Sequence, residues 1–350
     1  MSDFHFRVVP YESCVEEVIA FRNANRELAR DRRYFEWRYE RRPCRQKAMI
    51  VWGFDSQSHK VAAASIIPHD FYVLEGVFPV GVLGDISVVP ECRGRGVATR
   101  MLHFLREEPA FHAMRACVVL PNDEASHALE RAGWRNATAI ARFVKVVDIG
   151  PRLPGWLGGR SSAAGISRTI NFLSRFASLD GWYSYRTSPY HVAEIGEFND
   201  GFDDLWNEIP KRGRVLTVRD RSYLHWRYHE HPTVRCRGIE IRHGQRLRGY
   251  VVFHVAADVV EIDDFLAADA TVGLWLIKEF LAYVRQGRLA ANIYVRYNAN
   301  SFLAIPWNRF GFVRRRDFHR VMASVSRTET YLSLPSKEGF WFVTAGDKDV

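Results

Sequence analysis

The residues best suited to chemistry lie in one stretch, residues 84–98, where an apolar run passes into a turn and then into a helical pattern. The turn holds Gly94 and Gly96, with Arg93 and Arg95 beside them. Glycine permits positive φ and lets a ligand approach the backbone. Backbone N–H groups at the start of a helix attract anions, and the two arginines add positive charge. The stretch therefore predicts a phosphate- or pyrophosphate-binding loop, although it has the spacing of neither the dinucleotide fingerprint nor the Walker loop.

A carboxylate stands in the strand that leads into this loop. Asp85 lies a few residues before the glycines. Burial of a carboxylate in a cleft raises its pKa, which suits a general base. We therefore predict Asp85 as the catalytic residue. The alternative is structural: the carboxylate would accept backbone N–H bonds at an irregularity of the strand.

Two other classes of site find little support in the sequence. His229 and His231 stand in a His-Glu-His run, but no further ligand is suitably spaced, so we expect solvated loop histidines and no metal site. The sequence also contains no Gly-x-Ser-x-Gly elbow, so serine hydrolase chemistry has no support.

The elements that must position these residues follow from hydrophobic periodicity and capping residues. We expect strands at residues 4–9, 48–53, 61–67, 81–89, 115–120 and 137–147. We expect helices from a Ser13 cap through residue 30, from an Asp31 cap over residues 32–40, and at residues 97–106 and 122–132. This order implies an α/β fold of the α+β type, with a mixed sheet whose faces are covered.

The first-half pattern returns after residues 150–165, a stretch rich in Gly, Pro and Ser that we interpret as a linker. Seven residues of the segment 31–43 recur at the same offsets in the segment 220–232. Two copies indicate a duplicated domain. The predicted boundaries are residues 1–148 for the first domain, 149–180 for the linker with a connecting helix, and 181–350 for the second domain.

The repeated segment contains a Trp-Arg-Tyr run in both copies. We expect Trp37 and Trp226 to be core anchors, with the adjacent arginines tying each helix to a carboxylate. The alternative is that these aromatic and cationic side chains form the wall of an acceptor pocket. A second echo pairs Asn122 with Asn300, and the last strand of the second copy is expected near residues 340–347.

The spacing Arg-x-x-Gly-x-Ala of Arg93, Gly96 and Ala98, after a strand ending in Val-x-Pro, resembles the acyl-CoA motif of GNAT acetyltransferases. The segment from Asn122 to Gly133, at the right distance downstream, resembles the second cofactor motif of that family. The resemblance covers residues 4–147 well and extends more weakly to residues 190–345. It implies two tandem GNAT-like acyltransferase domains.

The resemblance also implies acetyl-CoA, or another acyl-CoA, as co-substrate, with no metal. The backbone near the end of the strand would meet the pantetheine arm, and residues 93–98 would hold the pyrophosphate. The acyl group would pass directly to an amine deprotonated by a carboxylate, here Asp85, while Cys92 would be passive. The implied cofactor-binding residues are Val88, Val89, Arg93, Gly94, Arg95, Gly96, Val97, Ala98 and Asn122.

The chain departs from the family pattern at two places. Many members place a tyrosine, which protonates the departing thiolate, where this chain has Leu129, so the general acid stays unassigned. The second-half counterpart of the loop, residues 265–273, has no Arg and one Gly. We therefore expect a degenerate second copy and a single CoA site. Asp263 and Asp264, near the place of Asp85 in that copy, are left as candidate acceptor contacts.

Composition bounds the partners and the compartment. The chain has 350 residues, 47% of them hydrophobic, which suits two domains. Five scattered cysteines and a start without a signal peptide predict a cytoplasmic protein. The net charge of +9 is interpreted as solvated arginine. We expect a small-molecule amine as acceptor, such as an amino sugar or amino acid, and neither membrane nor nucleic acid as partner; a homodimer is left open.

Two alternative functions stay open from the sequence. One is an aminoacyl-tRNA-dependent peptidyltransferase, a class that also has tandem GNAT-like halves but does not use CoA. The other is a CoA-binding regulatory protein without turnover, which Leu129 and the degenerate second copy would allow.

Overall fold

The computed structural model describes residues 4–26, 28–108, 114, 116–150, 166, 169–173, 175–176, 178–184, 186–298, 305–325 and 338–348. Apart from Gly150, the Gly-, Pro- and Ser-rich stretch 150–165 of the predicted linker lies outside these residues, as does Asn300 of the second echo. Within the described ranges, none of the helices combines the length and the apolar character that a bilayer span requires.

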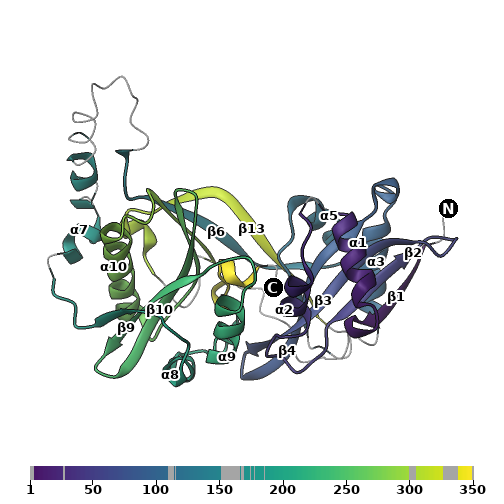
Figure 1. Cartoon of the computed structure of the whole chain (residues 1–350), viewed down its shortest axis with the longest axis horizontal. Helices are drawn as coiled ribbons and strands as arrows, with labels where there is room; N and C mark the ends of the chain where they lie inside the picture. Colours follow the sequence, from purple (N-terminus) through teal and green to yellow (C-terminus); the bar gives the residue numbers. More distant parts are fainter. Residues whose placement is uncertain are drawn as a thin grey trace.

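The first half contains the predicted alternation of strands and helices (Figure 1). Its strands are β1 (His5–Pro10), β2 (Met49–Phe54), β3 (Lys60–Val73), β4 (Gly76–Val88), β5 (Ala116–Val119) and β6 (Arg135–Val146). Its helices are α1 (Val15–Ala24), α2 (Arg32–Tyr39), α3 (Val97–Glu107) and α5 (Asp123–Arg131).

The second half repeats this alternation with a long central helix. Its strands are β7 (His191–Glu194), β8 (Val215–Thr217), β9 (Arg237–His243), β10 (Arg246–Ala256), β11 (Val259–Ala267), β12 (Asn292–Tyr297), β13 (Val313–Val325) and β14 (Trp341–Phe342). Its helices are α7 (Leu179–Ser184), α8 (Asp200–Glu208), α9 (Arg221–Leu224), which continues into a π-helix at His225–His229, and α10 (Ala270–Gln286).

Three expectations for these elements were wrong. Helix α1 ends at Ala24 instead of residue 30, and the Ser13 hydroxyl donates to the Pro10 carbonyl instead of capping the helix. Strands β3 and β4 extend well beyond residues 61–67 and 81–89 because they form one long hairpin, which pairs with β8 of the second half. The stretch 340–347 contains only the two-residue strand β14, and the long strand of that half is β13.

The predicted mixed sheet is confirmed, and it runs through both halves. The described strands form one 14-stranded sheet, in which β13 lies between β5 and β6, and β6 lies between β13 and β12. In the first half β4 and β5 are parallel and β13 follows; in the second half β11 and β12 are parallel and β6 follows. Each half is therefore completed by a strand that the other half supplies, with β6 and β13 crossing the middle of the molecule (Figure 1).

The repeated Trp-Arg-Tyr segments meet at the same junction. The Trp37 indole N–H donates to the Trp226 carbonyl, and the Trp226 indole N–H donates to the Trp37 carbonyl, both at 2.8 Å. The two rings stack with centroids 5.1 Å apart and are almost fully buried. Such reciprocity between equivalent residues is the signature of a two-fold relation. Both tryptophans are core anchors, as expected, and the core they anchor joins the two halves.

Separating the halves should therefore unfold the first one. A fragment of residues 1–148 lacks β13, which leaves β5 and β6 without their common neighbour and exposes Trp37. We expect this fragment to be aggregated or largely unfolded by circular dichroism, and to become soluble when it is co-expressed with residues 166–350. A soluble, folded fragment with native-like thermal unfolding would contradict the strand-exchange argument.

Candidate active site

The predicted phosphate loop is shaped by two left-handed glycines. Strand β4 ends at Val88, a short 3-10 helix follows at Pro90–Cys92, and Gly94 and Gly96 have φ of 75° and 76°. Gly96 is the N-cap of α3, and within the described part of the chain no side chain caps the helix there. A Cβ built on either glycine would meet none of the described atoms within 4 Å, so both face open space. The N–H groups of the first turn of α3 are thus presented to a ligand, as an anion site requires.

A cavity of about 640 Å³ lies against this loop. The predicted residues Val88, Arg93, Gly94, Gly96, Val97, Ala98 and Asn122 line it. Val89 and Arg95 are not among its lining residues, and the Val89 N–H donates to the Val61 carbonyl within the sheet. The structure thus brings seven of the nine predicted cofactor residues to one cavity.

The cavity opens where β4 and β5 part. The two strands pair in parallel only at Gly81 with Cys117 and Val82 with Val118; β4 then continues to Val88, whereas β5 stops at Val119. The far side of the cavity is the start of α5, where the Asn122 side chain accepts from the Ala125 N–H at 2.9 Å. Asn122 therefore shapes the cavity wall as a helix cap.

Asp85 lies at the irregularity of β4, with φ of 55°, and is held by cations. It forms ion pairs with Arg38 at 3.1 Å and Arg26 at 2.8 Å, lies 4.0 Å from Arg22, and accepts a hydrogen bond from the Tyr39 hydroxyl at 2.8 Å. Arg38 thus ties α2 to a carboxylate, as expected. In the second copy Arg227 instead donates to the Gly346 carbonyl at 3.0 Å.

The expectation of a raised pKa for Asp85 was wrong. Burial would raise the pKa of this carboxyl, but the guanidinium groups of Arg38, Arg22 and Arg26 outweigh burial and hold it well below its usual range. Asp85 is therefore ionised throughout the physiological range. A general base works best with a pKa near the operating pH, so the electrostatics do not favour this role.

The arginines around Asp85 line a second cavity of about 390 Å³, which shares Arg26 with the first. Arg22, Arg26 and Arg30 are site candidates that the sequence motifs did not predict. Their spacing of four residues is a signal in the sequence, although only Arg22 lies on helix α1.

In the second half, neither the start of the equivalent helix nor the gap between the equivalent parallel strands is open. Strand β11 leads into α10, whose N-cap Asp269 accepts from the Val272 N–H at 2.9 Å, so a carboxylate stands at this helix start. The gap beyond the parallel pairing of β11 and β12 is filled by the C-terminal segment: Thr344 bridges to Tyr297 of β12 and donates to Asp264 of β11 at 2.9 Å.

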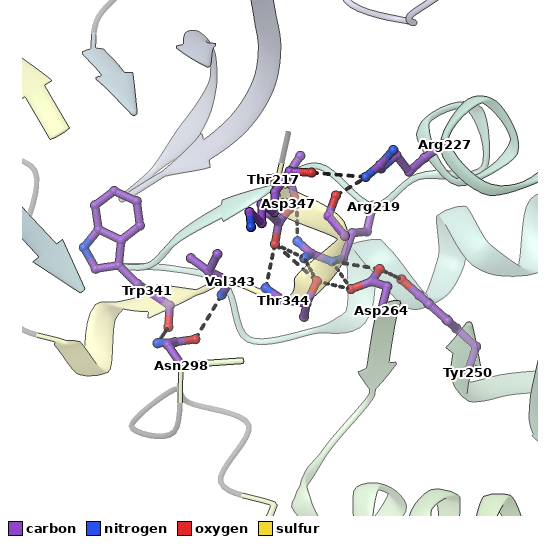
Figure 2. Close-up of polar contacts among 12 residues, drawn as sticks. Thr217, Arg219, Arg227, Tyr250, Asp264, Asn298, Trp341, Val343, Thr344 and Asp347 are labelled. Atoms are coloured by element: carbon purple, nitrogen blue, oxygen red, sulfur yellow. Dashed lines mark hydrogen bonds and ion pairs between the residues drawn. The ribbon is translucent and has the colours of Figure 1, made fainter. Parts of the chain in front are cut away.

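The two candidate acceptor contacts of this copy are already engaged. Asp264 is fully buried and accepts from Arg219 and Tyr250 in the network shown in Figure 2. Asp263 lies 2.8 Å from a ring nitrogen of His254. Asp264 therefore has a structural role, which corrects its place among the acceptor contacts.

The remaining reactive groups are largely buried. Cys92 lines the 640 Å³ cavity but is only 9% exposed and packs in the same core as Leu129. Leu129 is fully buried and apolar, so it offers no proton to a leaving group. His231 accepts from the Val234 N–H at 3.1 Å and its ring packs on Trp37. Across the described residues, no three His, Cys, Asp or Glu side chains gather as a metal site.

The fold is that of N-acyltransferases of known structure. Residues 15–135 match the acetyltransferase (GNAT) domain family. The first half thus carries a GNAT acetyltransferase domain, and the whole chain shares the fold of a tandem GNAT protein. A comparison with curated protein sequences found no significant match.

Solved structures share the whole fold at low identity. A probable N-acyltransferase from Enterococcus faecalis is similar with TM-score 0.64 and 11% identity, over 95% of this chain and 74% of that one. A GCN5-related N-acetyltransferase from Anabaena variabilis gives TM-score 0.62 and 12% identity, over 93% and 74%. A tandem GNAT protein from the clavulanic acid biosynthesis pathway has a TM-score of 0.56 and 13% identity, over 93% of this chain and 99% of that chain.

Gly96→Asp should weaken acetyl-CoA binding about 10- to 100-fold, because it adds a carboxylate and a Cβ at the mouth of the loop. Gly244→Asp, at another left-handed glycine in open space, is the matched control for backbone strain and should bind normally. Isothermal calorimetry measures both. Normal binding by Gly96→Asp would show that this loop does not hold the cofactor.

Asp85→Asn should leave the ascending limb of the kcat–pH profile in place, because Asp85 stays ionised far below that limb. The lowered folded-state pKa means that Asp85 stabilises the fold above about pH 4, with the contribution lost as pH falls further. The variant should therefore lose about 3 kcal/mol of unfolding free energy at pH 7, since buried arginines lose their counterion. As the pH is lowered, the unfolding free energy of the variant should fall less than that of the wild type.

Urea titrations at several pH values test the stability part, with the exposed Glu75→Gln as control. If Asp85 is instead the general base, Asp85→Asn should lose the ascending limb of the kcat–pH profile, and its kcat should fall by about 10²- to 10⁴-fold.

Proposed function

We propose that this protein is an acyl-CoA-dependent N-acyltransferase that transfers an acetyl group from acetyl-CoA to the amine of a small molecule. The observation that carries the proposal is the loop of Gly94 and Gly96, which presents the uncapped start of α3 to the 640 Å³ cavity. A structurally similar N-myristoyltransferase from Saccharomyces cerevisiae has been solved with bound myristoyl-CoA, whereas the similar tandem GNAT protein was solved without AcCoA.

The residues of the cavity fit a CoA molecule. The first turn of α3 and Arg93 would hold the pyrophosphate, while the exposed edge of β4 near Val88 would meet the pantetheine arm. When bound, the acyl-CoA supplies an activated thioester, whose C–S bond breaks as the amine forms a C–N bond and loses one proton. We propose that the acceptor binds in the 390 Å³ cavity, called here the arginine cavity. It adjoins the CoA position because Arg26 lines both cavities.

In this proposal Asp85 is not the group that accepts the proton from the amine. Its carboxylate is engaged by Arg26, Arg38 and Tyr39, and its low pKa makes it a weak base. We propose that Asp85 orients the arginines of the acceptor cavity, and that the amine loses its proton to water in the open part of the cavities. Asp85 is then a positioning residue.

One acetyl-CoA should bind per chain, and only in the first half. In the second half Asp269 places a carboxylate at the start of α10, and residues near Thr344 fill the gap between β11 and β12. Calorimetric titration with acetyl-CoA should therefore give a stoichiometry close to one. Two equivalent sites would contradict this asymmetry.

A thiol-release assay with acetyl-CoA and a panel of amines tests turnover itself, with a tRNA-binding measurement as control. CoA release that depends on an amine supports the proposal. Tight tRNA binding without CoA binding would favour the peptidyltransferase alternative, and CoA binding without release for any amine would favour a regulatory role.

A further inference from the structure

The cavity of about 390 Å³ beside the cofactor cavity has an unusual charge. Its lining contains four arginines, Arg22, Arg26, Arg30 and Arg38, and one carboxylate, Asp85. Even with Asp85 fully ionised, the guanidinium groups leave a net positive charge at the wall. A positive cavity with low-dielectric walls concentrates anions.

Arg22 shows that this charge is not satisfied within the protein. Its side chain is 3% exposed, and its Nη2 donates to the Ser65 hydroxyl at 2.8 Å. Among the residues that the structure describes, its buried Nε and Nη1 have no hydrogen-bond partner, and Nη1 lies 4.0 Å from Asp85, beyond hydrogen-bond reach. Buried unpaired N–H groups are costly, and those of a charged group more so. An acceptor atom supplied by a ligand would remove this cost.

Hydrogen bonds between the Asn23 side chain and the Arg30 backbone hold the part of the cavity wall that contains Arg30. The Asn23 side chain accepts from the Arg30 N–H and donates to the Arg30 carbonyl, both at 2.9 Å. The Arg30 guanidinium then lies over the Tyr34 ring, 4.8 Å from its centroid. Arg26 is 46% exposed and lines both cavities. The arginines of the cavity therefore range from the buried Arg22 to the exposed Arg26.

This arrangement selects against a simple cationic amine. Asp85 is the only carboxylate in the described lining, and it is already bound by Arg26, Arg38 and Tyr39. An ammonium group entering the cavity would meet three excess positive charges. A carboxylate or phosphate would instead meet guanidinium N–H groups, whose planar fork can donate two parallel hydrogen bonds to either group.

We propose that this cavity binds an anionic group of the acyl acceptor, so that the acceptor is an amine that also carries a carboxylate or a phosphate. The inference rests on the proposed function and narrows its substrate class to amino acids and phosphorylated amino compounds. The anionic group occupies the arginine cavity, and the amine lies toward Arg26 and the cofactor cavity.

Matched acceptor pairs test the inference. One arm compares amino acids with their carboxamides, and the other compares amino sugar phosphates with the free amino sugars, which distinguishes the two sources of charge. We expect the anionic member of at least one arm to have a kcat/KM about 10-fold or more above its neutral partner. Arg26→Gln and Arg30→Gln should reduce that ratio by raising KM, whereas Arg212→Gln, at an exposed site in the second half, should not.

The outcomes separate the inference from the function on which it rests. Amine-dependent CoA release with equal use of neutral and anionic acceptors, or a ratio unchanged in both variants, overturns the inference and leaves the proposed function standing. If no amine is acylated, calorimetry of the CoA-loaded protein with inorganic phosphate and with glutarate decides. Binding that Arg26→Gln and Arg30→Gln weaken supports the cavity assignment, and absence of binding by both anions overturns it.

Discussion

The antiparallel pairing of β6 with β13 is the contact on which the rest of the structure depends. Each of these strands belongs by chain order to one half and also completes the sheet of the other half. A sheet edge left unpaired exposes a row of N–H and C=O groups, so neither half has a closed sheet alone. The reciprocal hydrogen bonds of Trp37 and Trp226 fasten the same junction from the helical side. The two halves therefore share one sheet and one core.

Within this frame the two halves differ locally at the position where we propose the CoA site. Gly96 leaves the start of α3 open, whereas Asp269 supplies a carboxylate to the start of α10. The parting of β4 and β5 opens on a cavity, whereas the parting of β11 and β12 is filled by residues around Thr344. The side chain at a helix cap decides access to the backbone N–H groups at the helix start, and the route of the C-terminal segment decides whether the gap between the parallel strands stays open.

Charge organises the remaining part of the site. Asp85 sits in a strained left-handed conformation at the irregularity of β4, where it gathers arginines from α1, from the segment after it, and from α2. Strain of this kind persists only where surrounding contacts hold it. Here the ion pairs and the Tyr39 hydroxyl provide those contacts. The carboxylate thereby holds the arginines that line the 390 Å³ cavity, next to the 640 Å³ cavity where we propose that CoA binds.

The sequence by itself determined the loop of Gly94 and Gly96, the repeat and most elements of the first half, because turns, caps and periodicity act over a few neighbouring residues. It could not determine the strand exchange or the long β3–β4 hairpin, since both depend on pairing with strands far along the chain. The pKa of Asp85 was decided only by the tertiary structure. Burial and charge act in opposite directions on a carboxylate, and only the folded chain places Arg22, Arg26 and Arg38 around it.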